Sequence, residues 1–348
     1  MPYLLCSNCF TDHGLRLDAE RLGEVNHSSC KHCGSLVGKK LTEEVLEDLV
    51  YRFFVHGSAY RGRFGAAHQV QVNRSHKTEI NPPPWLALDV HLLERTQGLG
   101  FFYYAPRLWM LGEIEPLKRL ARKATRDAVF DEIIDKYPVR HLQSTERFYR
   151  VRKAPKNPET YGEYDSAPLA QTGKGRLDAK SSQVMYASPD LQVCLHECRV
   201  AAEDTLYAAT LRPKTRLRLL DLTVHPKEDD VSQFESLGMA LHMLFLAPKH
   251  SYAITRALAT RLAATGLDGL VYPSYFSILR TGHLPWEAAR AEPPNRLLAL
   301  DSAQHTDMVQ NLAIFGSPIA DGRVQLECIN RLILNRVQYD VSFGPANV

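Results

Sequence analysis

Glu197 is a carboxylate in a place where the sequence favours apolar residues. The segment around it predicts a helix that Ser188 caps and Pro189 begins. Residues three and four positions apart share a helix face, and the face of Glu197 also carries Val193, Cys194, Val200 and Ala201. Burying an unpaired charge is costly. We therefore expect Glu197 either to pair with an internal arginine or to serve a binding or catalytic site.

Other side chains that could bind or convert a ligand stand at or beside the ends of predicted strands, namely Arg150, Arg176, Tyr186 and Ser274. The alternating or apolar patterns predict these strands at residues 148–152, 183–187 and 269–272. Functional residues concentrate where loops leave a rigid scaffold. Together with Glu197, these residues form the candidate site.

Two Cys-x-x-Cys pairs near the N-terminus, Cys6/Cys9 and Cys30/Cys33, contain four of the seven cysteines. Each pair can direct two thiolates at one ion, so the spacing predicts a zinc ribbon. Four thiolates complete a tetrahedron and leave no open position, which makes the expected zinc structural. The pattern also favours a reducing cytoplasm over a disulfide framework.

The elements that position these residues fall into three segments: a zinc ribbon at 1–40, a mainly helical domain at 41–144 and an α+β domain at 145–348. The middle segment contains an expected loop at 60–77. In that loop Arg63 and His68 have the Arg-x4-His spacing of HEPN-type ribonucleases, which makes the middle domain a candidate HEPN-like domain. Two fixed positions in six arise often by chance, so this signal is weak.

The α+β segment alternates between strand and helix patterns. Beyond the strands above, we expect strands at 205–212 and 218–223, helices at 233–246 and 252–265, and further strand material at 297–300 and 324–343. A Gly-x-Gly-x-x-Gly block after a strand is absent from the sequence, which disfavours a dehydrogenase.

Composition narrows the class of protein further. The chain has 348 residues, of which 45% are hydrophobic and 23% charged, as is typical of a globular protein with two or three domains. The formal net charge of +3 is small, and the basic residues near the cysteines, Lys31, His32, Lys39 and Lys40, form only a thin patch. A nucleic-acid partner is therefore not favoured. The sequence has neither a secretory signal nor a long apolar run, so we expect a cytoplasmic protein without a membrane span.

Five blocks within residues 148–274 resemble the RES family, which is named for Arg, Glu and Ser: FYRVR, GKGRLD, VMYAS, CLHE and GLVYPS. The resemblance covers about residues 145–310 and keeps the order of the blocks. RES proteins are bacterial toxins that degrade NAD, and their fold is similar to that of ADP-ribosyltransferases. The resemblance thus implies an α+β, ADP-ribosyltransferase-like catalytic domain that uses NAD as its substrate.

The same resemblance assigns roles to the candidate residues. It implies a catalytic set made of Arg150, Tyr186, Glu197 and Ser274, and NAD-binding roles for Arg150, Arg176, Tyr186 and Ser274. The sequence departs from the family pattern in two of the blocks. Leu177 and Asp178 follow Arg176 where the family often has Trp-Asn, and Val151 follows Arg150 where it sometimes has Tyr.

Cleavage of the nicotinamide–ribose bond needs residues of these types. Arginines suit the pyrophosphate because the guanidinium is planar and always charged. Tyr186 offers an aromatic surface. Glu197 places negative charge beside a ribose that becomes oxocarbenium-like in the transition state. The sequence does not distinguish the molecule that accepts the ribose. Water would make the protein a glycohydrolase, and phosphate would make it a phosphorylase.

Two alternatives stay open, one from the same enzyme class and one that is not an enzyme. An ADP-ribosyltransferase that modifies a macromolecule would need the same NAD pocket. A non-enzymatic zinc-ribbon protein that binds nucleic acid would need more basic residues around the ribbon. For the favoured enzyme we expect a toxin or antiphage defence effector. Its N-terminal regions would sense a trigger, restrain the enzyme or assemble it, with an antitoxin, a regulatory protein or a second copy of the chain as partner.

Overall fold

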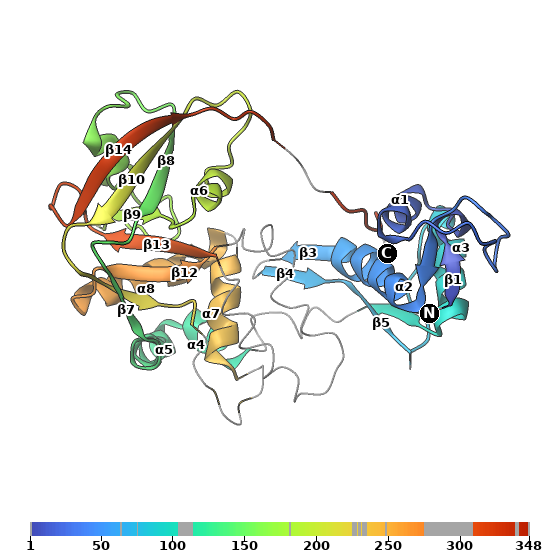
Figure 1. Ribbon diagram of the computed structural model, residues 1–348. Coiled ribbons are helices and arrows are strands. Elements are labelled where there is room, and N and C mark those ends of the chain that lie inside the picture. Colours follow the sequence, from blue (N-terminus) through green and yellow to red (C-terminus); the bar gives the residue numbers. More distant parts are fainter. Residues whose placement is uncertain are drawn as a thin grey trace. The chain divides into compact units, whose positions relative to one another are not determined.

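The computed structural model in Figure 1 describes residues 2–62, 65–74, 76–103, 114–180, 182–224, 228, 231, 235–247, 249–274, 309–337 and 341–346. Contacts within the chain define two compact units. The first consists of Met1–Gly62, Ala66–Met110 and Gln338–Val348, and the second of Arg63–Gly65 and Leu111–Val337. The second unit is therefore inserted into the sequence of the first. This division differs from the three segments that the sequence suggests.

The first unit joins the cysteine-rich segment to the helices that follow it. Its helices are α1 (His13–Leu22), α2 (Glu43–Val50) and α3 (Pro84–Gln97), and its paired strands are β1 (Tyr3–Cys6) with β2 (Lys40–Thr42) and β5 (Val70–Asn73) with β6 (Gly100–Tyr103). One buried cluster runs from Leu5 and Phe10 to Leu93 and Phe101. Residues 1–40 contain too few apolar side chains for a core of their own, so they share this one.

The last described residues also pack on the first unit. The backbone N–H of Phe343 donates to Asp18 Oδ2 at 2.9 Å, and the Arg21 guanidinium lies 5.7 Å from the centre of the Phe343 ring. A Cβ on Gly57 would lie 2.5 Å from Gly344 Cα, so the two backbones touch at a point where only glycine fits. The strand expected at 324–343 therefore ends earlier, as β14 (Val324–Leu332).

The second unit contains two sheets (Figure 1). The five-stranded sheet has the order β7 (Val139–Leu142), β11 (Leu217–Asp221), β12 (Gly269–Pro273), β13 (Gln310–Phe315) and β9 (Val184–Ala187). Only the β11–β12 pair is parallel among the pairs of this sheet that the structure describes. The three-stranded sheet has the order β14, β10 (Leu206–Pro213) and β8 (Phe148–Lys153), with antiparallel pairs. The unit is thus α+β, as expected.

The two faces of the five-stranded sheet differ in character. One face carries Met185, Val271, Leu312 and Ile314, which join Phe148 and Leu211 of the other sheet in one buried cluster. Tyr272 lies opposite Asn311, and Tyr186 lies opposite Ala313. Because side chains alternate along a strand, these residues lie on the second face, away from the apolar cluster. The second face is therefore the one that brings the candidate polar residues together.

Helices of the second unit are α4 (Glu115–Ala121), α5 (Lys123–Lys136), α6 (Leu191–Glu197), α7 (Leu237–Leu246) and α8 (Tyr252–Ala264). The sequence correctly predicts α6, α7 and α8, but α6 begins later than expected. Asp190, not Ser188, caps it, because the Asp190 carboxylate accepts from the N–H groups of Gln192 and Val193. Ser188 is buried and donates to the Gln310 carbonyl at 2.7 Å.

Residues 60–77 are not simply a loop, because three short strands cross them: β3 (Ala59–Gly62), β4 (Gly65–His68) and β5. Four-residue strands are too short for a clear alternation in the sequence. Arg63 of the HEPN-type spacing and the strand expected at 297–300 lie outside the described residues. Among the helices that the structure describes, none has the length and apolar character needed to cross a membrane.

Candidate active site and cysteine cluster

The four cysteines of the N-terminal pairs come together as predicted. Their Sγ atoms all lie within 4.8 Å of one another, and neighbouring pairs are 3.5–3.8 Å apart. A tetrahedral zinc ion with Zn–S bonds of about 2.3 Å separates its sulfurs by about 3.8 Å. The donor set and spacing therefore fit zinc. Cys6, Cys9, Cys30 and Cys33 would hold the ion, which would supply a structural crosslink.

The thiol environments also differ within the cluster. Burial raises the pKa of the Cys6 thiol to about 11 and raises that of Cys9 as well. Burial acts in the same direction on Cys30, but hydrogen bonds from the N–H groups of Cys33 and His32 outweigh it and lower that pKa to about 7. A Cβ on Gly38 would lie 2.8 Å from Cys6 Sγ, so the loop approaches the sulfur closely.

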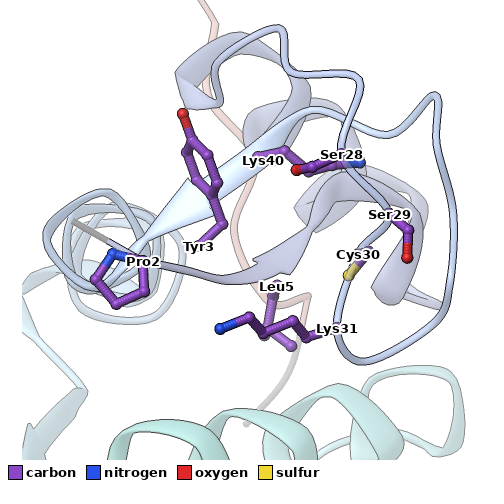
Figure 2. Close-up of a pocket in the computed structure, with 8 residues that line it drawn as sticks. All are labelled: Pro2, Tyr3, Leu5, Ser28, Ser29, Cys30, Lys31 and Lys40. Carbon is purple, nitrogen blue, oxygen red and sulfur yellow. The ribbon is translucent and has the colours of Figure 1, made fainter.

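Lys40 is buried beside the cluster, opposite Cys6 in the β1–β2 pair. Its ammonium donates to the carbonyls of Ser35 and Gly38, both at 2.9 Å. Zinc with four thiolates carries a net charge of about −2, and the Lys40 ammonium supplies charge of the opposite sign. A cavity of about 230 Å³ next to it is lined by Pro2, Tyr3, Leu5, Ser28, Ser29, Cys30, Lys31 and Lys40 (Figure 2).

Glu197 forms the centre of the candidate active site in the second unit. Its Oε1 accepts from the Ser274 hydroxyl at 2.8 Å and from the Asn311 amide at 2.7 Å. Both donors are buried, with 2% and 4% of their surface exposed. Glu197 itself is exposed, because it is the last residue of α6 rather than the middle of a buried face. Its partners among the described residues are a hydroxyl and an amide, not the internal arginine of the alternative interpretation.

The two donors lie at one end of the central strands of the five-stranded sheet. Ser274 directly follows β12, and Asn311 is the second residue of the antiparallel β13, so both stand at the carboxyl end of β12. Parallel strands commonly bind ligands at their carboxyl ends, and β11 and β12 are a parallel pair. Burial, then the charge of Glu197, raises the pKa of the neighbouring Tyr272.

Arg150 is placed differently from the phosphate-binding role that the resemblance implies. It is 7% exposed, and its guanidinium donates to the carbonyls of Tyr186 at 2.7 Å and Asp165 at 3.0 Å. Its Nε is buried without a partner among the described residues. Burial, together with the charge of Arg152, lowers the pKa of Arg150 to about 10. This geometry makes Arg150 a support for the backbone around Tyr186, and a direct phosphate contact stays a prediction.

Tyr186 anchors the loop that precedes its strand. Its hydroxyl donates to Asp178 Oδ1 at 2.8 Å and accepts from the N–H groups of Leu177 and Asp178. Burial, then the Asp178 charge, raises the pKa of Tyr186. A Cβ on Gly175 would lie 2.0 Å from Asp178 Oδ1, so the loop requires glycine there. The hydroxyl is fully used, and only the ring of Tyr186 remains to contact a ligand.

Arg176 is half-buried at the turn of the same loop. Its guanidinium donates to the carbonyls of Leu244 and Ala247, and it lies 4.8 Å from the centre of the Tyr252 ring. Arg256 and Thr255 of α8 hold the loop by hydrogen bonds to the carbonyls of Gly175 and Arg176. Arg176 is therefore fixed between the loop and the helices.

The structure thus brings Glu197 and Ser274 into direct contact and joins Arg150, Tyr186 and Arg176 through the backbone. Sequence reasoning missed Asn311, Asp178 and Tyr252. An asparagine near the start of the apolar strand QNLAIF is a signal that could have identified Asn311, because asparagine is depleted in strands. In the sequence, Asp178 is marked only by its departure from the family pattern.

Cys194 and Cys198 flank Glu197 on and after α6 and have no catalytic geometry. Their thiols donate to the carbonyls of Tyr149 and Val151 on β8 at 3.2 and 3.6 Å. Burial raises the pKa of both thiols, that of Cys194 to about 12. Nucleophilic cysteines need the thiolate, so these residues anchor α6 to the sheet.

Comparison with protein families matches the RES domain to residues 147–283. Among solved structures, the crystal structure of the M. tuberculosis MbcT–MbcA toxin–antitoxin complex contains a similar chain, with 15% sequence identity and a TM-score of 0.35. That match covers 58% of this chain and 91% of the other. A search of curated proteins finds no match.

Proposed function

Because residues 147–283 match the RES domain, we propose that the chain is an enzyme that cleaves the nicotinamide–ribose bond of NAD. The observation that carries the proposal is the Glu197 carboxylate, which Ser274 and Asn311 hold at the carboxyl end of β12. Both hydrogen bonds reach Oε1. Among the described residues no bond reaches Oε2, which leaves that oxygen for the substrate.

The proposed step needs little covalent chemistry from the protein. The bond between ribose C1′ and the nicotinamide nitrogen breaks, and its electron pair leaves with nicotinamide. The negative charge of Glu197 stabilises the oxocarbenium-like ribose, which favours the transition state over the bound substrate. An acceptor oxygen then bonds to C1′, and its proton leaves to solvent. Water gives a glycohydrolase and inorganic phosphate gives a phosphorylase.

The Tyr186 ring, Ser274 and Arg176 are the proposed NAD-binding groups. The Tyr186 ring and Asn311 lie on the same face of the five-stranded sheet. Arg150 contributes by fixing the Tyr186 carbonyl. The role of toxin or defence effector, and an antitoxin as its partner, belong to the same proposal.

The test is to incubate the purified protein with NAD, with and without phosphate, and to measure free nicotinamide and the ribose-containing product. Release of nicotinamide with ADP-ribose, or with a phosphorylated ADP-ribose, supports the proposal and identifies the acceptor. Transfer of label from NAD to protein or nucleic acid would instead identify an ADP-ribosyltransferase. If nicotinamide is not released, the proposal is wrong.

A further inference from the structure

Asn311 contacts the central carboxylate of the site but lies beyond the matched family residues, which end at 283. It is buried, and it lies opposite Tyr272 in the β12–β13 pair. Because a carboxylate only accepts hydrogen bonds, the amide nitrogen of Asn311 must be the atom that faces Glu197. A hydrogen bond to an ionised group is about twice as strong as one between neutral groups.

The start of β13 is fixed on both sides. The Gln310 carbonyl accepts from the Ser188 hydroxyl at 2.7 Å, and the Gln310 amide donates to the Thr223 hydroxyl at 3.2 Å. Thr223 is itself held by Asp221 at the end of β11. Asn311 therefore projects from a rigid element, which holds a partner side chain more accurately than a loop does.

Glu197 needs such a partner because its own position is unfavourable. It ends α6, where the helix dipole is negative and disfavours a carboxylate. It is also exposed, so few packing contacts restrict its rotamers. Ser274 supplies one donor, but a hydroxyl rotates and can equally accept. The N–H groups of Asn311 are fixed in the plane of its amide, and the side chain is buried, so Asn311 supplies the directional restraint.

We propose that Asn311 is a positioning residue that holds Glu197 by Oε1 so that Oε2 faces the ribose of NAD. This inference rests on the proposed function and adds a residue to it. The expected contribution is to the rate of bond cleavage rather than to NAD affinity, because the restraint acts on the group that stabilises the transition state.

The test compares Asn311→Leu and Asn311→Asp with the unmodified protein, and uses Asn330→Asp as a control. Asn330 is exposed on β14, so its change adds the same charge to the same unit without touching the site. For Asn311→Leu we expect kcat to fall about tenfold or more, with KM changed less than about threefold. Thermal unfolding of each variant gives the folded fraction used to normalise the rate.

Asn311→Asp tests the role of residue 311 as a hydrogen-bond donor to Glu197 through the pH dependence of the activity. The introduced carboxyl can donate to Glu197 only while it holds a proton, and two adjacent carboxylates share one. The activity of this variant relative to the unmodified protein should therefore fall as the pH rises and that proton is lost. Among the described residues, the groups whose pKa values the Glu197 charge raises include Cys194, Cys198 and Tyr272. Burial raises the pKa of each, the Glu197 charge adds to the rise, and none ionises near neutral pH.

The outcomes separate the two proposals. A normal kcat per folded molecule in both variants would overturn the role of Asn311 and leave the proposed function intact. A fall in kcat for Asn311→Leu, with a pH-dependent ratio for Asn311→Asp and no change for Asn330→Asp, would support it. If the unmodified protein releases no nicotinamide, the proposed function fails, and the role of Asn311 fails with it.

Discussion

At the scale of single residues, the question for Glu197 is whether its charge or only its hydrogen bonds matter. Glu197→Gln keeps the shape and can still accept from Ser274 and Asn311 at its amide oxygen. It removes the charge that the proposed mechanism places beside the ribose. We expect nicotinamide release to fall roughly a hundredfold or more, because a preorganised electrostatic contribution is lost. NAD affinity should change much less.

Glu203→Gln is the matched control, because Glu203 is exposed just after α6. It should release nicotinamide at the normal rate. A Glu197→Gln variant with a much lower melting temperature and near-normal release per folded molecule would show that Glu197 is structural. Steady-state kinetics and thermal unfolding of both variants decide between these results.

Arg150 tests the difference between binding a phosphate and supporting a loop. Arg150→Ala loses two charge-assisted bonds to buried carbonyls, so we expect the free energy of unfolding to fall by at least about 1.5 kcal/mol. Arg152→Ala, on the same strand but half-exposed, should be nearly neutral because its ion pair with Glu163 is long, at 3.9 Å. Denaturant unfolding measures both changes.

If Arg150 instead contacts a phosphate of NAD directly, Arg150→Ala should give another result. Calorimetry with NAD, performed on a Glu197→Gln background, would then show weaker binding for Arg150→Ala with an unchanged unfolding midpoint. That outcome would return Arg150 to the substrate-binding set and remove its supporting role.

At the scale of elements, the cysteine cluster makes a prediction about metal content. Purified protein never exposed to a chelator should contain about one zinc ion per chain, bound by the four thiolates. Cys6→Ser should lose the ion and destabilise the first unit, because metal binding supplies folding free energy. Elemental analysis that finds far less than one equivalent in the unmodified protein would exclude the site.

Lys40 offers a test of how the cysteine cluster would hold zinc. Lys40→Met keeps the length but removes the ammonium that joins the Ser35 and Gly38 carbonyls beside the thiolates. Partners that orient a metal site typically change metal affinity by about 10–100-fold. We therefore expect faster zinc release to a chromogenic chelator. Lys31→Met, an exposed neighbour, should behave like the unmodified protein.

The sequence predicts these elements well where a pattern is long or a spacing is specific. The cysteine pairs, the strands β8, β10 and β12 and the helix α8 all follow from such patterns. Asn311 could not be linked to Glu197, because the contact joins residues far apart in the chain through strand order, which local patterns do not encode. The exposure of Glu197 was also missed, since it depends on where α6 ends.

At the scale of the whole molecule, the boundaries of the second unit differ from the 145–348 segment that the sequence suggests for the catalytic domain. That segment lacks β7, the edge strand beside β11, and α5, whose Asp131 pairs with Arg261 of α8 at 2.7 Å. It also keeps residues 341–346, which belong to the first unit. A fragment of residues 114–337 contains every described element of the second unit beyond Gly65.

We therefore expect the 114–337 fragment to unfold cooperatively and to release nicotinamide, and the 145–348 fragment to be less stable. Leu142 of β7 is buried, and removing a buried leucine costs about 2–5 kcal/mol. For a domain of this size that lowers the melting temperature by roughly 4 °C or more. Circular dichroism and limited proteolysis of the two fragments test this directly. Equal melting temperatures would show that β7 and α5 are dispensable, and that the catalytic unit begins at β8 as its sequence motifs suggest.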